Sequence, residues 1–263
     1  MTDPVRWTPR RVLRALRSGV AFTSFGLLGL ALGLFVFPFE RLRGPNPEAV
    51  EWRCQAWVRW IFQLFVRLLF ALGIAEVRFL HPERLREPGT LVVANHPTLL
   101  DVVMIGSEMS QVDCIVKKEA FRNPFMRHVV VGTGYIPNDL GEPLIEACAE
   151  RLARGRSILV FPEGTRSPAE GLGRFARGAA HLVLAAGVPI TPVVVRCTPP
   201  ALMRGQKWYA IPDTLLRYEI EVGEPMDFKD LALAGGSRAL ASRQITRALR
   251  DFYEKRLHTP RRE

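Results

Sequence analysis

Cysteine is scarce in this sequence, which argues against zinc sites and disulfide frameworks. The four cysteines among 263 residues stand far apart, at Cys54, Cys114, Cys148 and Cys197. No C-x-x-C pair and no cluster of cysteine with histidine occurs. The sequence therefore favours neither a zinc module nor a dense disulfide framework, and a reducing compartment is expected.

Acidic residues are also in short supply. The chain has 26 Asp and Glu against 36 Lys and Arg, a formal net charge of +10, which calls for an anionic partner such as nucleic acid, a membrane or an acidic substrate. The basic residues are spread rather than striped, and the aromatic residues concentrate in the apolar N-terminal quarter, which argues against nucleic acid. Repeats and low-complexity tracts are absent, and a 48% share of hydrophobic residues excludes a disordered chain.

A long uncharged run dominates the N-terminal quarter. The 22 residues from Ser18 to Phe39 carry no charge, and as a helix they would span about 33 Å, enough to cross a hydrocarbon core. The run is too long for a signal peptide, and no small-x-small cleavage site follows it. A buried soluble helix is the alternative, which glycines at 26, 29 and 33 disfavour.

A second apolar segment, residues 52–74, has a different pattern. It is rich in Trp, Phe and Leu but also contains Arg53, Arg59 and Arg67, which would be costly inside a bilayer. An interfacial helix tolerates them, because long side chains reach back to the lipid phosphates. We therefore expect residues 1–75 to form a two-helix membrane element, and whether its first helix spans the bilayer is left open.

The remaining residues, 76–263, alternate between β-rich and helical stretches. We expect strands at Val77–Leu80, Leu91–Ala94, Cys114–Val116, Val129–Ile136, Ser157–Phe161, Ile190–Arg196 and Tyr218–Val222. We expect helices at Leu99–Met109, Glu119–His128, Pro143–Arg154, Phe175–Ala186 and Ser237–His258. This alternation predicts a single α/β sheet domain.

The segment TLVVANHPTLLD, residues 90–101, contains the first candidate site. An apolar strand ends at Ala94, and loops after strand ends commonly hold catalytic groups in α/β domains. His96 and Asp101 form an H-x-x-x-x-D pair, in which the carboxylate would orient the imidazole as a general base. A purely structural interpretation is that Thr98 and Asp101 form a capping box, with Asp101 supporting a helix start.

A second candidate site is FPEGTRS, residues 161–167, which follows another apolar strand. Glycine lets the backbone approach an anion, and arginine offers a fork that matches phosphate. More glycine and arginine follow, at Gly171, Gly173, Arg174, Arg177 and Gly178. Lys117 and Lys118 stand at the end of a third strand. Together these residues predict a rim of strand ends with one His/Asp pair and several phosphate-seeking cations.

In this order and spacing, NHPTLLD followed by FPEGTRS resembles the membrane-bound glycerolipid acyltransferases, the 1-acylglycerol-3-phosphate acyltransferases of the PlsC type. The resemblance covers residues 91–195 and includes FARGA (175–179) and VPITPVVV (188–195). It implies an α/β acyltransferase domain behind a hydrophobic two-helix membrane element. It also implies that the enzyme acylates lysophosphatidic acid to phosphatidic acid in phospholipid biosynthesis.

The resemblance also implies roles for single residues. His96 of the HX4D motif is the general base and Asp101 orients it. Substrate-binding roles fall on the strand-end residues Lys117, Lys118, Glu163, Gly164, Thr165 and Arg166, with Arg166 as a phosphate ligand. The acyl donor is a thioester of coenzyme A or acyl carrier protein, and neither a metal nor a prosthetic group is expected. The implied location is the inner membrane, with the catalytic domain facing the cytoplasm and in contact with membrane lipids.

One position departs from the family pattern. Asn138 stands where the family's second motif normally has an arginine that holds the acceptor phosphate. The acceptor can therefore also be phosphate-free, such as a lyso-ornithine lipid or a specialised acyl lipid or polyene hydroxyl. A thioesterase-like hydrolase and a non-catalytic membrane-binding protein are two further candidates, although both leave the paired motifs unexplained.

Overall fold

A mixed β-sheet forms the centre of the fold. The computed structural model describes residues 8–124, 126–141, 143–209, 211–233 and 237–258, and within them the sheet has seven strands in the order β1-β7-β6-β2-β5-β3-β4. The strands are β1 Ala75–Leu80, β2 Leu91–Ala94, β3 Asp113–Val116, β4 Ile136–Pro137, β5 Ile158–Val160, β6 Ile190–Thr198 and β7 Leu216–Val222. Only β6 and β7 pair antiparallel. The carboxyl ends of β2, β5, β3 and β6 therefore meet at one edge.

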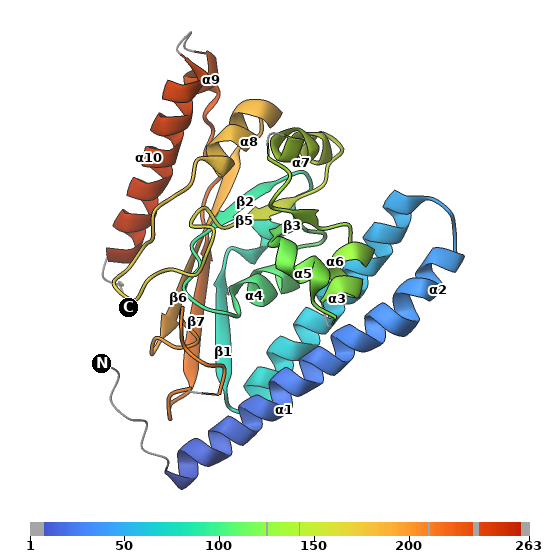
Figure 1. Ribbon diagram of the computed structural model, residues 1–263. Helices are drawn as coiled ribbons and strands as arrows, with labels where there is room; N and C mark the ends of the chain where they lie inside the picture. Colours follow the sequence, from blue (N-terminus) through green and yellow to red (C-terminus); the bar gives the residue numbers. More distant parts are fainter. Residues whose placement is uncertain (1–7, 125, 142, 210, 234–236, 259–263) are drawn as a thin grey trace.

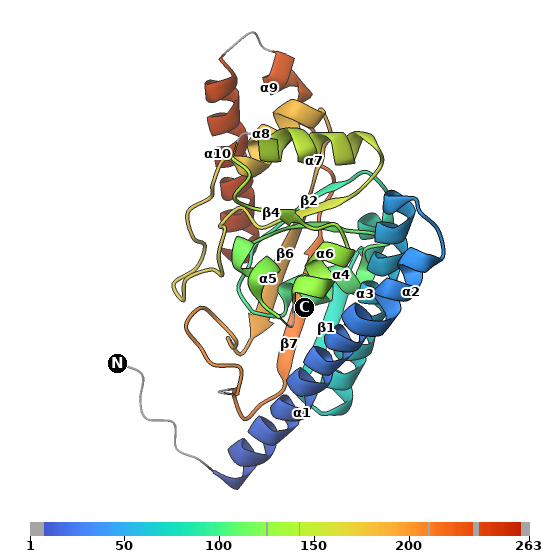
Figure 2. The same ribbon diagram turned by 45° about the vertical axis from the view of Figure 1, so that its right-hand side comes forward.

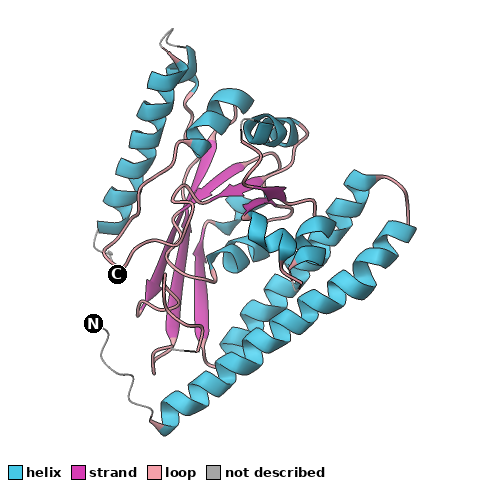
Figure 3. Ribbon diagram, in the orientation of Figure 1, coloured by secondary structure: helices cyan, strands magenta, loops and turns pink. Residues whose placement is uncertain are grey.

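Helices cover both faces of this sheet (Figure 1, Figure 3). One face carries α3 and α4, and the other carries α7, α8 and α10. The longer helices are α3 Pro47–Ala71, α4 Asp101–Glu108, α7 Pro143–Ala153, α8 Gly178–Ala186 and α10 Arg238–His258. The short ones are a 3-10 turn at Pro82–Arg86, α5 Lys118–Arg122, α6 Arg127–Gly132 and α9 Lys229–Leu233.

Strand β2 contributes side chains to the hydrophobic cores on both faces of the sheet. Val92 and Ala94 lie in the core shared with α3 and α4, whereas Leu91 and Val93 lie in the core with α7, α8 and α10. All four side chains are fully buried. Successive side chains of a strand point to opposite faces, so a continuous apolar run is what a strand covered on both sides requires.

The N-terminal residues form one long helical rod that returns through α3 as an antiparallel hairpin (Figure 2). The rod consists of α1 Pro9–Ala31, a π-helical segment Leu32–Val36 and α2 Phe37–Leu42. Within the described residues it is the one helix long and apolar enough to cross a membrane, by length and composition. Large apolar side chains remain exposed along it, among them Leu16, Leu27, Phe35 and Leu42.

The π-helical segment lies next to a proline and contains a glycine in close contact with α6. Pro38 lacks an N–H and follows directly, and a wider helical turn accommodates its ring. Gly33 faces α6, and a Cβ there would lie 2.3 Å from the Cβ of His128. The absence of a side chain at Gly33 thus allows the rod to contact α6. Packing therefore explains one of the three glycines noted at 26, 29 and 33.

Helix α3 belongs to the sheet's own packing as much as to the hairpin. Its Gln55 Nε2 donates to buried Asp113 Oδ1 at 2.8 Å, which joins the helix to the start of β3. The Arg53 Nε donates to Glu40 Oε2 at 2.7 Å, and the Arg59 Nε donates to the Ser107 carbonyl at 3.3 Å. The sequence predicts that these arginines reach lipid phosphates, and the structure shows protein partners for two of the three.

One expected strand is wrong in type. Residues 129–136 form most of α6 and then the two-residue strand β4, although a run of β-branched residues favours a strand. Gly132 lies against the ring of Phe37, where a Cβ would be 2.3 Å from a ring carbon. Tertiary packing under the rod therefore overrides local propensity. The remaining expected strands and longer helices are present with ends shifted by a few residues, whereas the expected helix 119–128 is interrupted between α5 and α6.

Candidate active site

The two predicted catalytic side chains meet at the carboxyl edge of the sheet. His96 follows β2, and its Nδ1 lies 2.8 Å from Oδ2 of Asp101, the first residue of α4. A carboxylate only accepts hydrogen bonds, so the imidazole Nδ1–H donates and the Nε2 lone pair is free to take a proton. This is the geometry of a general base oriented by an acid.

Asp101 is completely buried and has several donors around it. Besides His96, its carboxylate accepts from the Thr98 backbone N–H at 2.7 Å and from the Thr98 hydroxyl. The Tyr218 hydroxyl in turn donates to Thr98 Oγ1 at 3.1 Å. Asp101 therefore holds the histidine and also closes the turn before α4. The residue at the cap of α4 is Leu100, and no side chain caps the helix, so the capping box is not formed.

The environment of Asp101 has opposing electrostatic effects. Burial raises the pKa of Asp101 above its usual value, because a charged carboxylate loses its hydration there. The hydrogen bonds from His96 and Thr98 oppose that rise. A buried carboxylate is stabilised most when His96 is positively charged. His96 carries that positive charge after it has taken a proton from the acceptor.

The imidazole of His96 is held flat and partly exposed. Its ring stacks on Phe161, with 4.2 Å between centroids and 27° between planes, and the side chain is 17% exposed. Phe161 directly follows β5, the neighbour of β2 in the sheet. The second motif therefore supplies the platform on which the first motif's base lies.

Glu163 ties the two motifs together through the backbone. Its Oε1 accepts from the His96 N–H at 3.1 Å and from the Ser167 hydroxyl at 2.7 Å. Its Oε2 accepts from the Gly173 N–H at 2.7 Å, and the Ser167 N–H donates to the His96 carbonyl at 2.7 Å. Both carboxylate oxygens thus serve to hold loops in place.

The remaining residues of this loop are arranged for a turn. Gly164 has a φ of +66°, which glycine adopts without strain, and its N–H closes the turn to the Phe161 carbonyl at 3.0 Å. Thr165 is half-buried in the same turn. Arg166 points back into the protein, where its Nη1 donates to the carbonyls of Leu202 and Met203, each at 2.9 Å.

The predicted lysines lie at the end of β3, two strands away from β2 and about 10 Å across the sheet. Lys117 is exposed at the start of α5. The ammonium of Lys118 lies 2.6 Å from Asp139, and the Lys118 N–H donates to Asn138 Oδ1 at 3.3 Å. Asn138 and Asp139 thus both contact Lys118, one of the predicted substrate-binding residues.

None of the four cysteines lies in the two motifs. Cys197 on β6 has a pKa raised to about 11, chiefly by burial, and is therefore protonated at neutral pH. Among the described residues, no group of three His, Cys, Asp or Glu side chains is placed to hold a metal ion.

Sequence reasoning missed two supports of the site. The Tyr218 hydroxyl reaches the catalytic turn from β7, and a strand pattern gives no sign of this contact. The Leu202 carbonyl accepts from the Leu99 N–H at 3.0 Å as well as from Arg166, and Leu202 has a positive φ of 57°. A leucine with a positive φ has no signal in the sequence, so this contact is found only in the structure.

Comparison with known proteins agrees with this geometry. Residues 76–196 match the family model described as Acyltransferase. The chain is 30% identical over 187 residues to the lyso-ornithine lipid O-acyltransferase of Pseudomonas aeruginosa, an alignment covering 70% of this chain and 69% of that protein. It is 28% identical to the 1-acyl-sn-glycerol-3-phosphate acyltransferase of the same organism, covering 62% of each.

The fold has a solved counterpart. The 1-acyl-sn-glycerophosphate acyltransferase PlsC of Thermotoga maritima superposes with a TM-score of 0.63 at 21% identity, covering 91% of this chain and 97% of that one. That likeness shows the mixed α/β fold and includes the N-terminal hairpin region. With the family model and the relatives above, the chain belongs to the glycerolipid acyltransferase family and is an O-acyltransferase.

Proposed function

We propose that this protein transfers an acyl group from a thioester to the hydroxyl of a lysolipid, with His96 as the general base. The pairing of His96 with buried Asp101 at 2.8 Å carries the proposal. Nε2 accepts the hydroxyl proton as the acceptor oxygen attacks the thioester carbonyl. The carbon–sulfur bond then breaks, and the imidazolium returns the proton to the leaving thiolate.

Lysophosphatidic acid is the first candidate acceptor, which would make phosphatidic acid the product. Support comes from exposed Lys117 at the same sheet edge and from the name of one relative. The donor is a thioester of coenzyme A or of acyl carrier protein. The exposed apolar side of the rod supports membrane association, and we place the catalytic domain on the cytoplasmic face of the inner membrane.

A phosphate-free lysolipid is the second candidate, and specific contacts favour it. Asp139 neutralises Lys118, Asn138 is uncharged, and Arg166 already donates to two carbonyls. A head group with a dianionic phosphate would meet few free cations here, whereas a zwitterionic amino-acid head group would match a mixed lysine and aspartate rim. The lyso-ornithine lipid enzyme among the relatives has such an acceptor by name.

The test is acyl transfer by the purified full chain in detergent, with labelled acyl-CoA or acyl carrier protein. Lysophosphatidic acid and lyso-ornithine lipid are offered separately. His96→Ala should lower turnover by about 10³-fold or more, since general base catalysis is worth about 10²–10⁴-fold. His258→Ala, an exposed histidine at the end of α10, is the matched control.

The same assay separates the rival functions. Release of free fatty acid without any acceptor would indicate a hydrolase. Turnover in His96→Ala equal to that of the wild type would sink the proposed mechanism. Membrane binding that persists while neither substrate reacts, in the wild type and in every variant, would indicate a non-catalytic membrane protein.

A further inference from the structure

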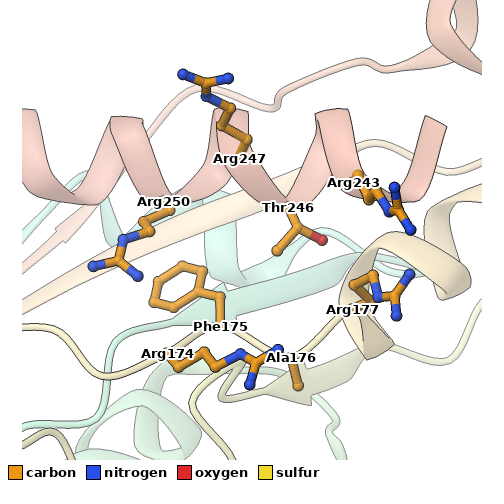
Figure 4. A pocket seen from close by; sticks show the side chains of 8 residues that line it. All are labelled: Arg174, Phe175, Ala176, Arg177, Arg243, Thr246, Arg247 and Arg250. Carbon is orange, nitrogen blue, oxygen red and sulfur yellow. The ribbon is translucent and has the colours of Figure 1, made fainter. Parts of the chain in front are cut away.

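A cavity of about 740 Å³ lies beside the site, between α10 and the loop that leads into α8. We call it the arginine pocket, and Figure 4 shows the residues that line it: Arg174, Phe175, Ala176, Arg177, Arg243, Thr246, Arg247 and Arg250. No acidic side chain lines it. Cavities of about 300–1,000 Å³ are the usual size for small-molecule sites.

The arginines come from two elements that are far apart in sequence. Arg243, Arg247 and Arg250 follow one side of α10 at helical spacing, and Arg174 and Arg177 come from the loop (Figure 4). Arg243 and Arg177 lie one above the other at the same end of the pocket, and Arg250 lies at the opposite end. Arg247 extends away from the loop, so four guanidinium groups frame the hollow.

Little in the protein balances this charge. Arg250 pairs with Glu254 at 2.7 Å, but in the described part of the chain no ion pair or side-chain hydrogen bond holds Arg174, Arg177 or Arg243. The pKa of nearby His181 is lowered first by burial and then by Arg177 and Arg238. Like charges that converge without partners are unfavourable, so an anion would stabilise the arrangement.

The start of α8 adds to the positive potential. Arg177 is the residue before Gly178, where α8 begins, and no side chain caps the first N–H groups of that helix. Free N–H groups and the helix dipole favour phosphate at such a position. Guanidinium groups offer the paired donors that phosphate oxygens accept, so both features select the same kind of ligand.

The pocket is linked to the catalytic loops by direct contacts. The Gly173 N–H donates to Glu163, and the Ala176 N–H donates to the Pro162 carbonyl at 2.7 Å. Phe175, the apolar wall, contacts the Tyr253 ring with 5.6 Å between centroids. The Tyr253 hydroxyl donates to the Val93 carbonyl on β2, about 10 Å along the chain from His96.

The position in the fold decides which phosphate fits. Helices α8 and α10 lie across the sheet from the hairpin of α1 and α3 (Figure 1), whose exposed apolar side chains suit the bilayer. A lipid head group would approach from the hairpin, whereas this pocket opens on the other side. A water-soluble ligand with several phosphates and a flexible arm that reaches the catalytic edge fits better.

We infer that the arginine pocket binds the phosphate groups of the nucleotide end of an acyl-CoA donor. This inference rests on the proposed function, in which the thioester end of the same molecule meets His96. Arg174, Arg177 and Arg243 contact the phosphates, and the pantetheine arm passes along the loop 162–173 toward the strand ends. The inference selects coenzyme A over acyl carrier protein as the donor.

The probe is coenzyme A itself, without an acyl group, titrated calorimetrically into the full chain in detergent. Arg177→Ala combined with Arg243→Ala should raise the Kd about tenfold or more and flatten its dependence on salt. Arg154→Ala, an exposed arginine directly after α7, is the matched control and should leave the Kd unchanged. Dephospho-CoA should bind the wild type more weakly than coenzyme A.

The outcomes separate this inference from the proposed function. His96→Ala should bind coenzyme A like the wild type. Persistent turnover in that variant would overturn the proposed function, and the Kd for coenzyme A would still test the arginine pocket independently. An unchanged Kd in the double variant would overturn the inference, as would a wild type that binds no coenzyme A. Loss only of transfer from acyl carrier protein, or only of binding to anionic vesicles, would also overturn it. If the double variant fails to fold, Arg174→Ala on the loop provides the same measurement.

Discussion

Glu163 accepts a hydrogen bond from the backbone N–H of His96, with 3.1 Å between the two atoms, so the second motif holds the first in place. The second carboxylate oxygen holds Gly173, and Ser167 bonds to both Glu163 and His96. This network holds the segment whose imidazole stacks on Phe161. We therefore predict that Glu163 acts through His96, as a positioning residue.

Glu163→Gln should lower kcat about tenfold and leave the acceptor KM nearly unchanged. The amide keeps one accepting oxygen, but its NH₂ faces an N–H or O–H donor and leaves a buried donor unpaired. Steady-state kinetics over a range of acceptor concentrations measures the split. A large rise in KM at constant kcat would instead make Glu163 a direct acceptor ligand, as the family resemblance implies.

Asp101→Asn should lower kcat by about 10²–10³-fold while His96 keeps its position. The amide oxygen can still accept from His96 and Thr98 N–H, and its NH₂ can donate to Thr98 Oγ1. What disappears is the negative charge that stabilises the imidazolium formed during transfer. Single-turnover assays report the chemical step, and a variant with wild-type kcat would contradict the role given to Asp101.

The same variant makes a pH prediction about stability. Because burial raises the pKa of Asp101, the folded state binds the proton more tightly than the unfolded chain. Stability from this group is therefore present below its unfolded pKa and declines as pH rises through the raised folded pKa. Asp101→Asn has no such loss, so its melting temperature should match the wild type near pH 4 and exceed it at neutral pH. Thermal unfolding at several pH values checks this, and a constant difference would contradict it.

Arg166→Ala should destabilise the protein and reduce transfer to every acceptor alike. Its guanidinium satisfies the carbonyls of Leu202 and Met203, and an unpaired buried carbonyl costs about 1–3 kcal/mol. Leu202 also holds Leu99 in the catalytic turn, so the effect spreads to His96. Thermal unfolding and parallel kinetics with both lysolipids measure it. A rise in KM confined to lysophosphatidic acid would restore the phosphate-binding role that the sequence suggests.

The sequence predicted the pairing of His96 with Asp101 because its signal is local. His96 and Asp101 lie within one turn after a buried strand, and the chain has few ways to arrange five residues there. The second motif was found for the same reason, and its strand β5 lies next to β2 as the shared edge requires. The roles of single residues were harder to predict than their positions. Arg166, for example, donates to the carbonyls of residues 202 and 203, which belong to no motif that the sequence shows.

The same contrast explains the errors in the fold. Residues 129–136 have strand propensity, yet contacts of Gly132 and His128 with the N-terminal rod accompany a helix over the first half of them. Those contacts join segments about a hundred residues apart, which periodicity does not register. The arginines of α3 were predicted from the helix alone, whereas their partners Glu40 and Ser107 lie on different elements.

Asn138→Arg should shift acceptor preference toward lysophosphatidic acid. Asn138 lies at the end of β4, where its oxygen accepts from the Lys118 N–H, and Asp139 beside it neutralises the Lys118 ammonium. A new guanidinium adds a phosphate fork at this rim and competes for Asp139, which releases Lys118. One charge-assisted bond corresponds to about tenfold in kcat/KM. We expect that change in the ratio of lysophosphatidic acid to lyso-ornithine lipid turnover.

Asn138→Gln is the control for this experiment, because it changes side-chain length without adding charge. Its acceptor ratio should stay within about twofold of the wild type. Asp139→Asn makes the complementary test, since it frees Lys118 without a new cation and should shift the ratio in the same direction by a smaller factor. If both charge-changing variants leave the ratio where it was, the rim at β3 and β4 does not contact the acceptor head group. The acceptor would then be selected by residues at the ends of β2 and β5, and Lys117 and Lys118 at the end of β3 would not contribute.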